Sequence, residues 1–158
     1  VIIAAVVFTK FRAIPFWQFS DAIACSAPIG LLLVRVANFI NGELYGRVTN
    51  MPWGMIFPSG GSEPRHPSQL YEAFLEGVVL FVVLYVLSRN EKICKKAGLL
   101  TGIFMVGYAV ARGAVELVRQ PDPHLGILTG GLTMGQWLSI PVFLFGLYLI
   151  LRPNKRAM

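Results

Sequence analysis

The sequence predicts an all-α, polytopic membrane protein built as a helix bundle. Apolar residues make up 55% of the chain and charged residues only 14%, whereas a soluble domain normally carries about a quarter charged residues. The apolar residues come in runs long enough to span a bilayer, about 20 residues each. The sequence contains no series of short alternating segments, which a membrane barrel would need.

Breaks in the apolar runs predict the tail of one span followed by four full spans. Asp21 suits the start of the first full span, because a carboxylate is favourable near a helix N-terminus. Pro67 and Ser68 suit the start of the second. We expect one transmembrane domain over 1–158. Its predicted spans are 1–8 (partial), 21–39, 68–87, 97–118 and 134–151.

The basic residues predict the orientation of the bundle. Three basic clusters contain every lysine, and they fall on one side if four spans cross between them. By the positive-inside rule this side is cytoplasmic, together with the C-terminus. The loops 41–67 and 120–131 then face outward. The clusters are Lys10 and Arg12; Arg89, Lys92, Lys95 and Lys96; and Arg152, Lys155 and Arg156.

The remaining cations are all arginines, in the outer loops or near the outer ends of spans. Arginine suits two-point contact with phosphate or carboxylate, so this half of the bundle is predicted to bind an anion. An ionisable side chain inside a membrane usually marks function. These arginines are Arg35, Arg47, Arg65, Arg112 and Arg119.

Two groups of residues could form the anion site. In the first, Arg35 would hold a phosphate, Asn38 would donate a hydrogen bond and Glu43 would fix the arginine; a structural ion pair is the alternative. The second is a stripe on the third full span, in which Glu116 pairs with one of two arginines. A ladder that joins helices is the alternative there, but the surplus positive charge favours an anion site. The stripe consists of Tyr108, Arg112, Glu116 and Arg119, which share one helix face.

A third group lies at the start of the second span. Gln69, Glu72 and Glu76 share one helix face, and we expect Glu72 to pair with one of the arginines. His66 stands just before this span. We prefer a role in fixing the loop, while a general base or acid remains the alternative.

Other chemistry finds little support in the sequence. The two histidines fall on the outer side and the two cysteines, Cys25 and Cys94, toward the inner side, so they cannot share an ordinary zinc site. His124 is a lone loop residue that we expect to be solvated. No phosphate-binding glycine loop occurs. We expect no metal, no cofactor and, despite a net charge of +6, no nucleic-acid partner.

Without further comparison, the residues indicate an arginine-rich pocket near the outer leaflet, supported by glutamates. Such a pocket suits a phosphate-bearing amphiphile, such as a phospholipid, in the lipid bilayer. A transporter of anions or lipids is an alternative, although the buried charges gather at one leaflet. A phospholipid hydrolase that uses His66 as base is another.

Four segments resemble motifs of the bacterial phosphatidylglycerol–prolipoprotein diacylglyceryl transferases. The first is Arg-Val-Ala-Asn-Phe-Ile-Asn-Gly-Glu-Leu-Tyr-Gly-Arg at 35–47, which is similar to the family signature. The second is His-Pro-Ser-Gln-Leu-Tyr-Glu at 66–72. The third joins Tyr108, Arg112, Glu116 and Arg119, and the fourth is Met-Gly-Gln at 134–136. They occur in family order, and together they make a specific match.

The resemblance implies an enzyme of lipoprotein maturation in the bacterial inner membrane. It would move the diacylglyceryl group of phosphatidylglycerol to the thiol of the lipobox cysteine that follows a prolipoprotein signal peptide. A thioether forms and glycerol phosphate leaves. The nucleophilic thiol belongs to the substrate, so neither cysteine of this chain needs to react.

The resemblance also implies roles for individual residues. Arg35 would bind the headgroup and Arg112 would stabilise the departing phosphate, with Tyr108 and Glu116 orienting Arg112. Glu43 would belong to the catalytic set as part of the signature loop. The implied substrate-binding residues are Arg35, Asn38, Asn41, Gly46, His66, Gln69, Glu72 and Arg119.

The sequence departs from the family pattern in two ways. Val34 and Ala37 stand where the signature usually has glycine, and Val34 is expected to affect packing beside Arg35. The family also has an upstream histidine-glycine block, whose histidine is a candidate base for the thiol. Val1 lies inside an apolar run without a Met or signal-peptide layout, so we expect that block to lie in a missing N-terminal part.

Overall fold

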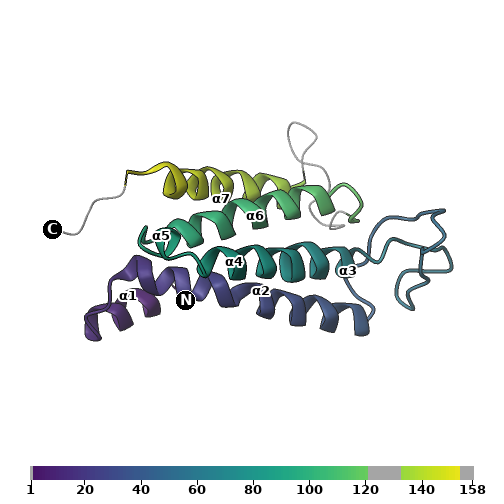
Figure 1. Cartoon of the computed structure of the whole chain (residues 1–158). Coiled ribbons are helices and arrows are strands. Elements are labelled where there is room, and N and C mark those ends of the chain that lie inside the picture. Colours follow the sequence, from purple (N-terminus) through teal and green to yellow (C-terminus); the bar gives the residue numbers. More distant parts are fainter. Residues whose placement is uncertain (1, 121–132, 154–158) are drawn as a thin grey trace.

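The computed structural model describes residues 2–120 and 133–153, and there the chain is an all-helical bundle (Figure 1). Its extended segments form only isolated bridges and no sheet within these ranges. The predicted fold class is therefore confirmed. The elements are α1 (Ile2–Phe11), α2 (Phe16–Ile40), α3 (Ser68–Glu72), η1 (Ala73–Val79), α4 (Leu80–Ser88), α5 (Glu91–Cys94), α6 (Leu99–Val115) and α7 (Met134–Leu151).

Three helical segments of the described chain are long and apolar enough to cross a membrane: Phe16–Ile40, Ser68–Ser88 and Met134–Leu151. The predicted span 97–118 forms α6, which is apolar but has only 17 residues. It packs against α2, α4 and α7, so it lies within the bundle. Four full spans were predicted; within the described residues three helices have spanning length, and the fourth predicted span is a shorter apolar helix.

The first full span begins earlier than predicted, and Asp21 does not start it. Proline at position 15 precedes the first helical turn, and α2 runs from Phe16. Asp21 instead accepts hydrogen bonds from the backbone N–H groups of Gly98 (2.6 Å) and Thr101 (2.8 Å) at the start of α6. The carboxylate therefore caps the N-terminus of a different helix.

The second span is one continuous rod whose middle part, η1, has π-helical geometry. Gly77 lies where this rod meets α2: a Cβ atom there would come within 2.8 Å of the Cβ atom of Leu32. A small residue lets two helix backbones approach closely in a membrane. Short π-helical segments are frequent at functional sites, and Glu76 lies in this one.

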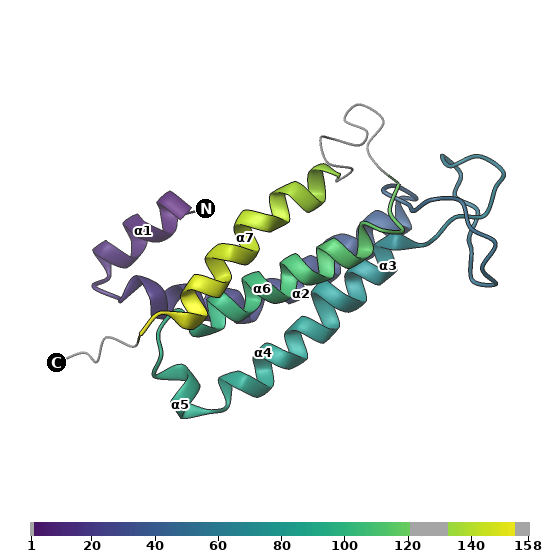
Figure 2. The ribbon, with the colours of Figure 1, turned by 90° about the horizontal axis from the view of Figure 1, so that it is seen from above.

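The loop 41–67 folds over one end of the bundle, opposite to α5 (Figures 1 and 2). Met55 and Arg65 exchange two backbone hydrogen bonds of 2.9 Å. The N–H of Gly46 donates to the carbonyl of His66 (2.8 Å), and that of Arg47 donates to Val118, just beyond α6 (2.9 Å). The first of these two bonds closes the loop on itself, and the second attaches it to the chain just beyond α6.

The opposite end holds α5 and the start of α6. Arg152 lies over the ring of Trp17, with its guanidinium carbon 4.5 Å from the ring centroid, and donates to the carbonyl of Ala97. Lys96 donates to the carbonyl of Ile150 (2.5 Å). Basic residues of the second and third clusters thus fasten α7 to α6 at this end. Lys155 and Arg156 lie outside the described residues.

Candidate functional site

Glu72 is the centre of a buried ionic cluster. Its side chain is fully buried and meets guanidinium groups from three segments. Arg35 on α2 places Nε 3.2 Å from one carboxylate oxygen, and Arg112 on α6 pairs with the other. Arg119, just beyond α6, lies 3.5 Å from that second oxygen. The expected pairing of Glu72 with an arginine is confirmed, and it extends to three arginines.

Two further carboxylates complete the cluster. Glu76 lies 3.6 Å from a terminal nitrogen of Arg35, and Glu116 lies 3.2 Å from one of Arg112. Three carboxylates therefore face three guanidinium groups. The α6 stripe has the predicted surplus of one positive charge, but Glu72 and Glu76 of the second span balance the charge of the whole cluster, which also includes Arg35.

Burial differs between the two signs of charge. The side chains of Arg35 and Arg112 are each 13% exposed, whereas those of Glu72 and Glu76 are 0% exposed. The carboxylates thus lie behind the arginines and hold them, while an edge of each arginine stays accessible. An anion can approach these edges, because charge-assisted contacts to arginine can be shared between two partners.

Glu43 does not fix Arg35, contrary to the prediction. Its side chain is exposed, and its Oε1 accepts a long hydrogen bond from the amide of Asn41 (3.4 Å). Its backbone carbonyl accepts from Nε2 of the buried Gln69 (2.6 Å). Gln69 therefore ties the signature loop to α3. The reason for the error is that Glu72 and Glu76 reach Arg35 from another helix.

Asn38 and Val34 lie on either side of Arg35 on α2. Asn38 is partly buried, as Arg35 is, so the two residues share a face of the helix. Val34 is exposed at 56%. Most of the Val34 surface therefore lies outside the packed interior of the described residues, and its effect on packing beside Arg35 stays a prediction.

Tyr108 lies on the α6 stripe but does not bind Arg112. Its ring stacks on Phe104, with centroids 6.1 Å apart, and packs against the core cluster of Leu80, Leu84 and Leu100. Among the described residues no hydrogen bond joins its hydroxyl to Arg112. Glu116 pairs with Arg112 as predicted, and Glu72 pairs with it in place of Tyr108.

Gly46 shapes the outer loop by having no side chain. A Cβ atom there would lie 2.7 Å from both His66 Cβ and the carbonyl oxygen of Val118. His66 places Nδ1 3.2 Å from the hydroxyl of Tyr71, which also accepts a hydrogen bond from Trp53 (2.8 Å). These contacts favour the interpretation of His66 as a residue that fixes the loop.

Two residues of this site were not in the predicted set. Glu76 was placed on the correct helix face by its spacing, but no site role was assigned to it. Gly135, at the start of α7, lies against the cluster: a Cβ atom there would come within 2.8 Å of Glu116 Oε2 and 3.2 Å of Arg112. Apart from the short Met-Gly-Gln segment, the sequence carries no signal for it. His124 and most of the predicted loop 120–131 lie outside the described residues.

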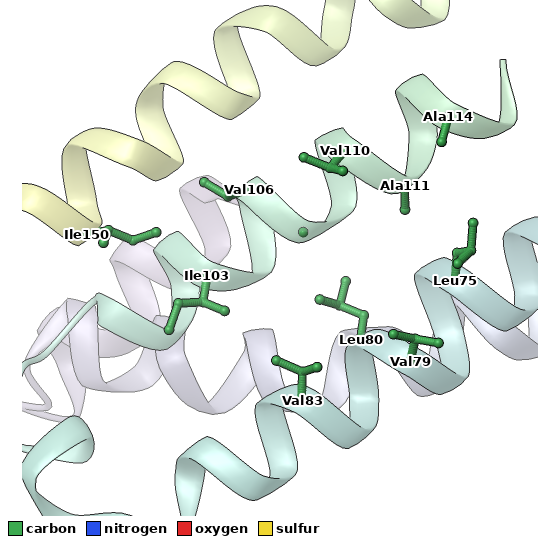
Figure 3. A pocket seen from close by; sticks show the side chains of 11 residues that line it. Leu75, Val79, Leu80, Val83, Ile103, Val106, Val110, Ala111, Ala114 and Ile150 are labelled. Atoms are coloured by element: carbon green, nitrogen blue, oxygen red, sulfur yellow. The ribbon is translucent and has the colours of Figure 1, made fainter. Parts of the chain in front are cut away.

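An apolar cavity of about 440 Å³ opens between η1, α4 and α6, close to the cluster (Figure 3). Its lining is aliphatic, and the residues nearest to Glu76 and Arg112 in the chain are Leu75 and Ala111. A groove of this chemistry suits a hydrocarbon chain. A second apolar cavity of about 240 Å³ lies between α6 and α7.

Comparison with known proteins gives consistent matches. The family model described as prolipoprotein diacylglyceryl transferase matches residues 1–152. The phosphatidylglycerol–prolipoprotein diacylglyceryl transferase of Shewanella oneidensis is 55% identical over 156 residues, which is 99% of this chain and 57% of that protein. Its namesake in Paramagnetospirillum magneticum is 56% identical over 158 residues, covering 99% of this chain and 59% of the relative. The one in Brucella ovis is 53% identical over 156 residues, covering 98% and 56%. The chain thus spans a little over half the length of these relatives.

Proposed function

The chain belongs to the prolipoprotein diacylglyceryl transferase family, and we propose on that basis that it transfers diacylglyceryl from phosphatidylglycerol to a prolipoprotein. The acceptor is the thiol of the lipobox cysteine behind the signal peptide. A carbon–sulfur bond forms at the glycerol carbon while its bond to the phosphate oxygen breaks. The thiol loses its proton to a base, and glycerol phosphate leaves.

The observation that carries this proposal is the pair Arg35 and Arg112, held at one site by Glu72 and each partly exposed. The reaction places additional negative charge on the leaving phosphate. Preorganised cationic donors stabilise such charge as it develops. We assign Arg35 to the bound headgroup and Arg112 to the departing phosphate, with Arg119 close to both.

The neighbouring residues support these two arginines. Glu116 and Glu72 orient Arg112, and Gln69 and Gly46 hold the signature loop against α3 and the end of α6. Asn38 lies on the Arg35 face, where it can donate to the headgroup. Glu43 and Asn41 interact with each other at the loop surface, and we assign them to the approach of the substrate. Tyr108 packs beneath the cluster.

The cavity between η1, α4 and α6 supports a lipid as the diacylglyceryl donor. Its aliphatic walls can take an acyl chain while the phosphate lies at the arginines. Burying apolar surface stabilises binding by roughly 25 cal/mol per Å². The donor would then reach the site from within the bilayer and not from water.

The charges at the two ends of the bundle support an orientation in the membrane. Lys92, Lys95 and Lys96 lie at the α5 end, and the arginine cluster lies near the opposite end, beneath the loop 41–67. By the positive-inside rule the lysine end is cytoplasmic. We propose a multi-pass protein of the bacterial inner membrane, with its site toward the outer leaflet and its C-terminus in the cytoplasm.

The proposal is tested by lipidation of a lipobox peptide by the full-length protein in phosphatidylglycerol vesicles, followed by mass spectrometry. Arg35→Ala and Arg112→Ala should each lower the rate by about 100-fold or more, the size expected for a lost transition-state donor. Lysine at either position should restore only part of the lipidation rate, because its ammonium group lacks the planar arrangement of donors by which a guanidinium binds phosphate at two points.

Arg89→Ala is the matched control, since Arg89 is exposed at the other end of the bundle and its guanidinium interacts with Tyr85 on its own helix, away from the cluster. It should leave the rate unchanged. Full activity of either site variant would contradict the assigned role. Release of glycerol phosphate without any thiol acceptor would instead indicate a hydrolase.

A further inference from the structure

Glu76 is the least compensated charge in the cluster. Its side chain is fully buried, and its one ion pair is the 3.6 Å contact with Arg35. Neither of its oxygens has a hydrogen-bond partner within 2–120 and 133–153. Glu72, by contrast, meets three arginines, and Glu116 lies 3.2 Å from Arg112.

The groups around Glu76 come from three elements. Arg35 faces it from α2, Glu72 lies one turn earlier on its own rod, and Arg112 lies nearby on α6. The phenol of Tyr108 on α6 is also close. An arriving phosphate diester brings one more negative charge to a buried cluster whose three acidic and three basic groups are already balanced. A buried carboxylate without a partner then becomes unfavourable in its charged form.

We propose that Glu76 takes up one proton when the phosphate of phosphatidylglycerol binds Arg35. The inference rests on the proposed function, which supplies that lipid as substrate. A proton from water forms an O–H bond on the Glu76 carboxylate, while Arg35 stays protonated and exchanges Glu76 for the phosphate. When glycerol phosphate leaves, the proton returns to water and the ion pair forms again.

The geometry selects Glu76 over the other two glutamates. Glu72 keeps Arg112 and Arg119 when Arg35 is engaged by phosphate, and Glu116 keeps Arg112. Glu76 has no second ion pair among the described residues. Once protonated it becomes a donor, and Glu72 Oε2 is an acceptor close by that has no hydrogen bond in this part of the chain. Glu76 is therefore a positioning residue that acts through Arg35.

The test is calorimetric titration of short-chain phosphatidylglycerol into the full-length protein in detergent. Runs in two buffers of different ionisation enthalpy count the protons taken up. We expect about one proton per bound lipid, and an affinity that falls about tenfold per pH unit as pH rises, because uptake becomes harder. Wild-type binding without proton uptake would overturn the inference and leave the lipid substrate intact.

Two variants assign the proton. Glu76→Gln should bind the lipid with no uptake and a flat pH profile, whereas Glu63→Gln, exposed in the outer loop, should behave like wild type. Uptake that persists in Glu76→Gln would overturn the assignment, and if that variant fails to fold, a wild-type count of zero would still overturn the inference. Absence of any lipid binding would overturn both proposals. Binding with uptake but without peptide lipidation would overturn only the transferase.

Discussion

The carboxylate of Glu72 forms ion pairs with three arginines and so holds them at one site. Each arginine comes from a different part of the chain, and each would be costly to bury without a counter-charge. Because the carboxylate is fully buried and the arginines are not, the cluster presents cationic edges outward. In the proposed function, a phosphate would therefore meet the arginines before the carboxylates. The buried glutamates position the arginines and do not compete at the exposed edge.

A substitution at Gly135 tests whether Glu116 positions Arg112, and it changes no charge. Gly135→Ala places a Cβ atom 2.8 Å from Glu116 Oε2, so Glu116 must shift and its 3.2 Å contact with Arg112 is disturbed. We expect the lipidation rate to fall about 10- to 100-fold, because small misplacements of catalytic groups have effects of this size. Steady-state kinetics should show the loss mainly in kcat.

Gly30→Ala is the control for that substitution. Gly30 lies on α2, and a methyl group added to its Cα atom would meet nothing within 4 Å. Alanine is also the better helix former. This variant should keep wild-type kinetics. Equal activity of the two variants would show that Glu116 does not position Arg112.

Among the elements, α2 and α6 set the site by their common alignment. Asp21 on α2 caps the start of α6 through Gly98 and Thr101, and it also accepts from the Thr101 hydroxyl (2.7 Å). Arg35 lies fourteen residues beyond Asp21, and Arg112 lies fourteen residues beyond Gly98. At 1.5 Å per residue both lie about 21 Å from the cap. The cap therefore brings the two arginines to the same level.

The cap predicts a stability effect at the end remote from the site. Asp21→Ala leaves the N–H groups of Gly98 and Thr101 without their acceptor, which we expect to lower the free energy of unfolding by about 1–3 kcal/mol. Asp21→Asn retains one acceptor oxygen and should lose less. Thermal unfolding in detergent measures the change, and hydrogen exchange should rise at 98–102.

Glu91→Ala serves as the comparison, because Glu91 is exposed and its 3.8 Å pair with Lys95 lies on the surface. Such a pair contributes about 0–1 kcal/mol. Similar unfolding temperatures for the Asp21→Ala and Glu91→Ala variants would refute the capping role.

At the scale of the whole bundle, the lysines and the paired arginines of the described residues lie in different places. Among the described residues, Lys92, Lys95 and Lys96 lie at the α5 end, where Lys96 donates to the carbonyl of Ile150, and the paired arginines lie toward the other end. The lysine end has the charge that holds a loop in the cytoplasm. The other end holds the buried ionic cluster, and the apolar cavity runs from beside it along η1, α4 and α6; we propose that this combination binds an amphiphilic substrate.

Thiol labelling tests this arrangement in intact cells. Cys94 is exposed at the α5 end, so a membrane-impermeant maleimide should label it only after the inner membrane is permeabilised. A cysteine at position 63, made by Glu63→Cys in a Cys94→Ser background, should react from outside without permeabilisation. The reverse pattern would contradict the proposed orientation.

The sequence alone determined the class of the fold and most of its helices. Long apolar runs can satisfy their backbone groups in a bilayer only as helices, so α7 has the predicted bounds 134–151 and the second span differs by one residue. The start of the first full span was predicted wrongly, at 21, whereas α2 begins at Phe16. Asp21 carries the correct signal for an N-terminus, but local sequence does not say that the helix it caps begins at position 99.

At the candidate site, too, the sequence predicted which residues take part, and the structure showed how they pair. Residue type and spacing singled out Arg35, Arg112 and Glu72, because buried charges are rare enough in apolar spans to stand out. Which carboxylate meets which arginine depended on helix packing: Glu43 is only eight residues from Arg35 in sequence, yet Glu72 and Glu76 are its partners. Only the tertiary structure decided this pairing, because ion pairs between helices depend on the angle and depth at which the helices pack.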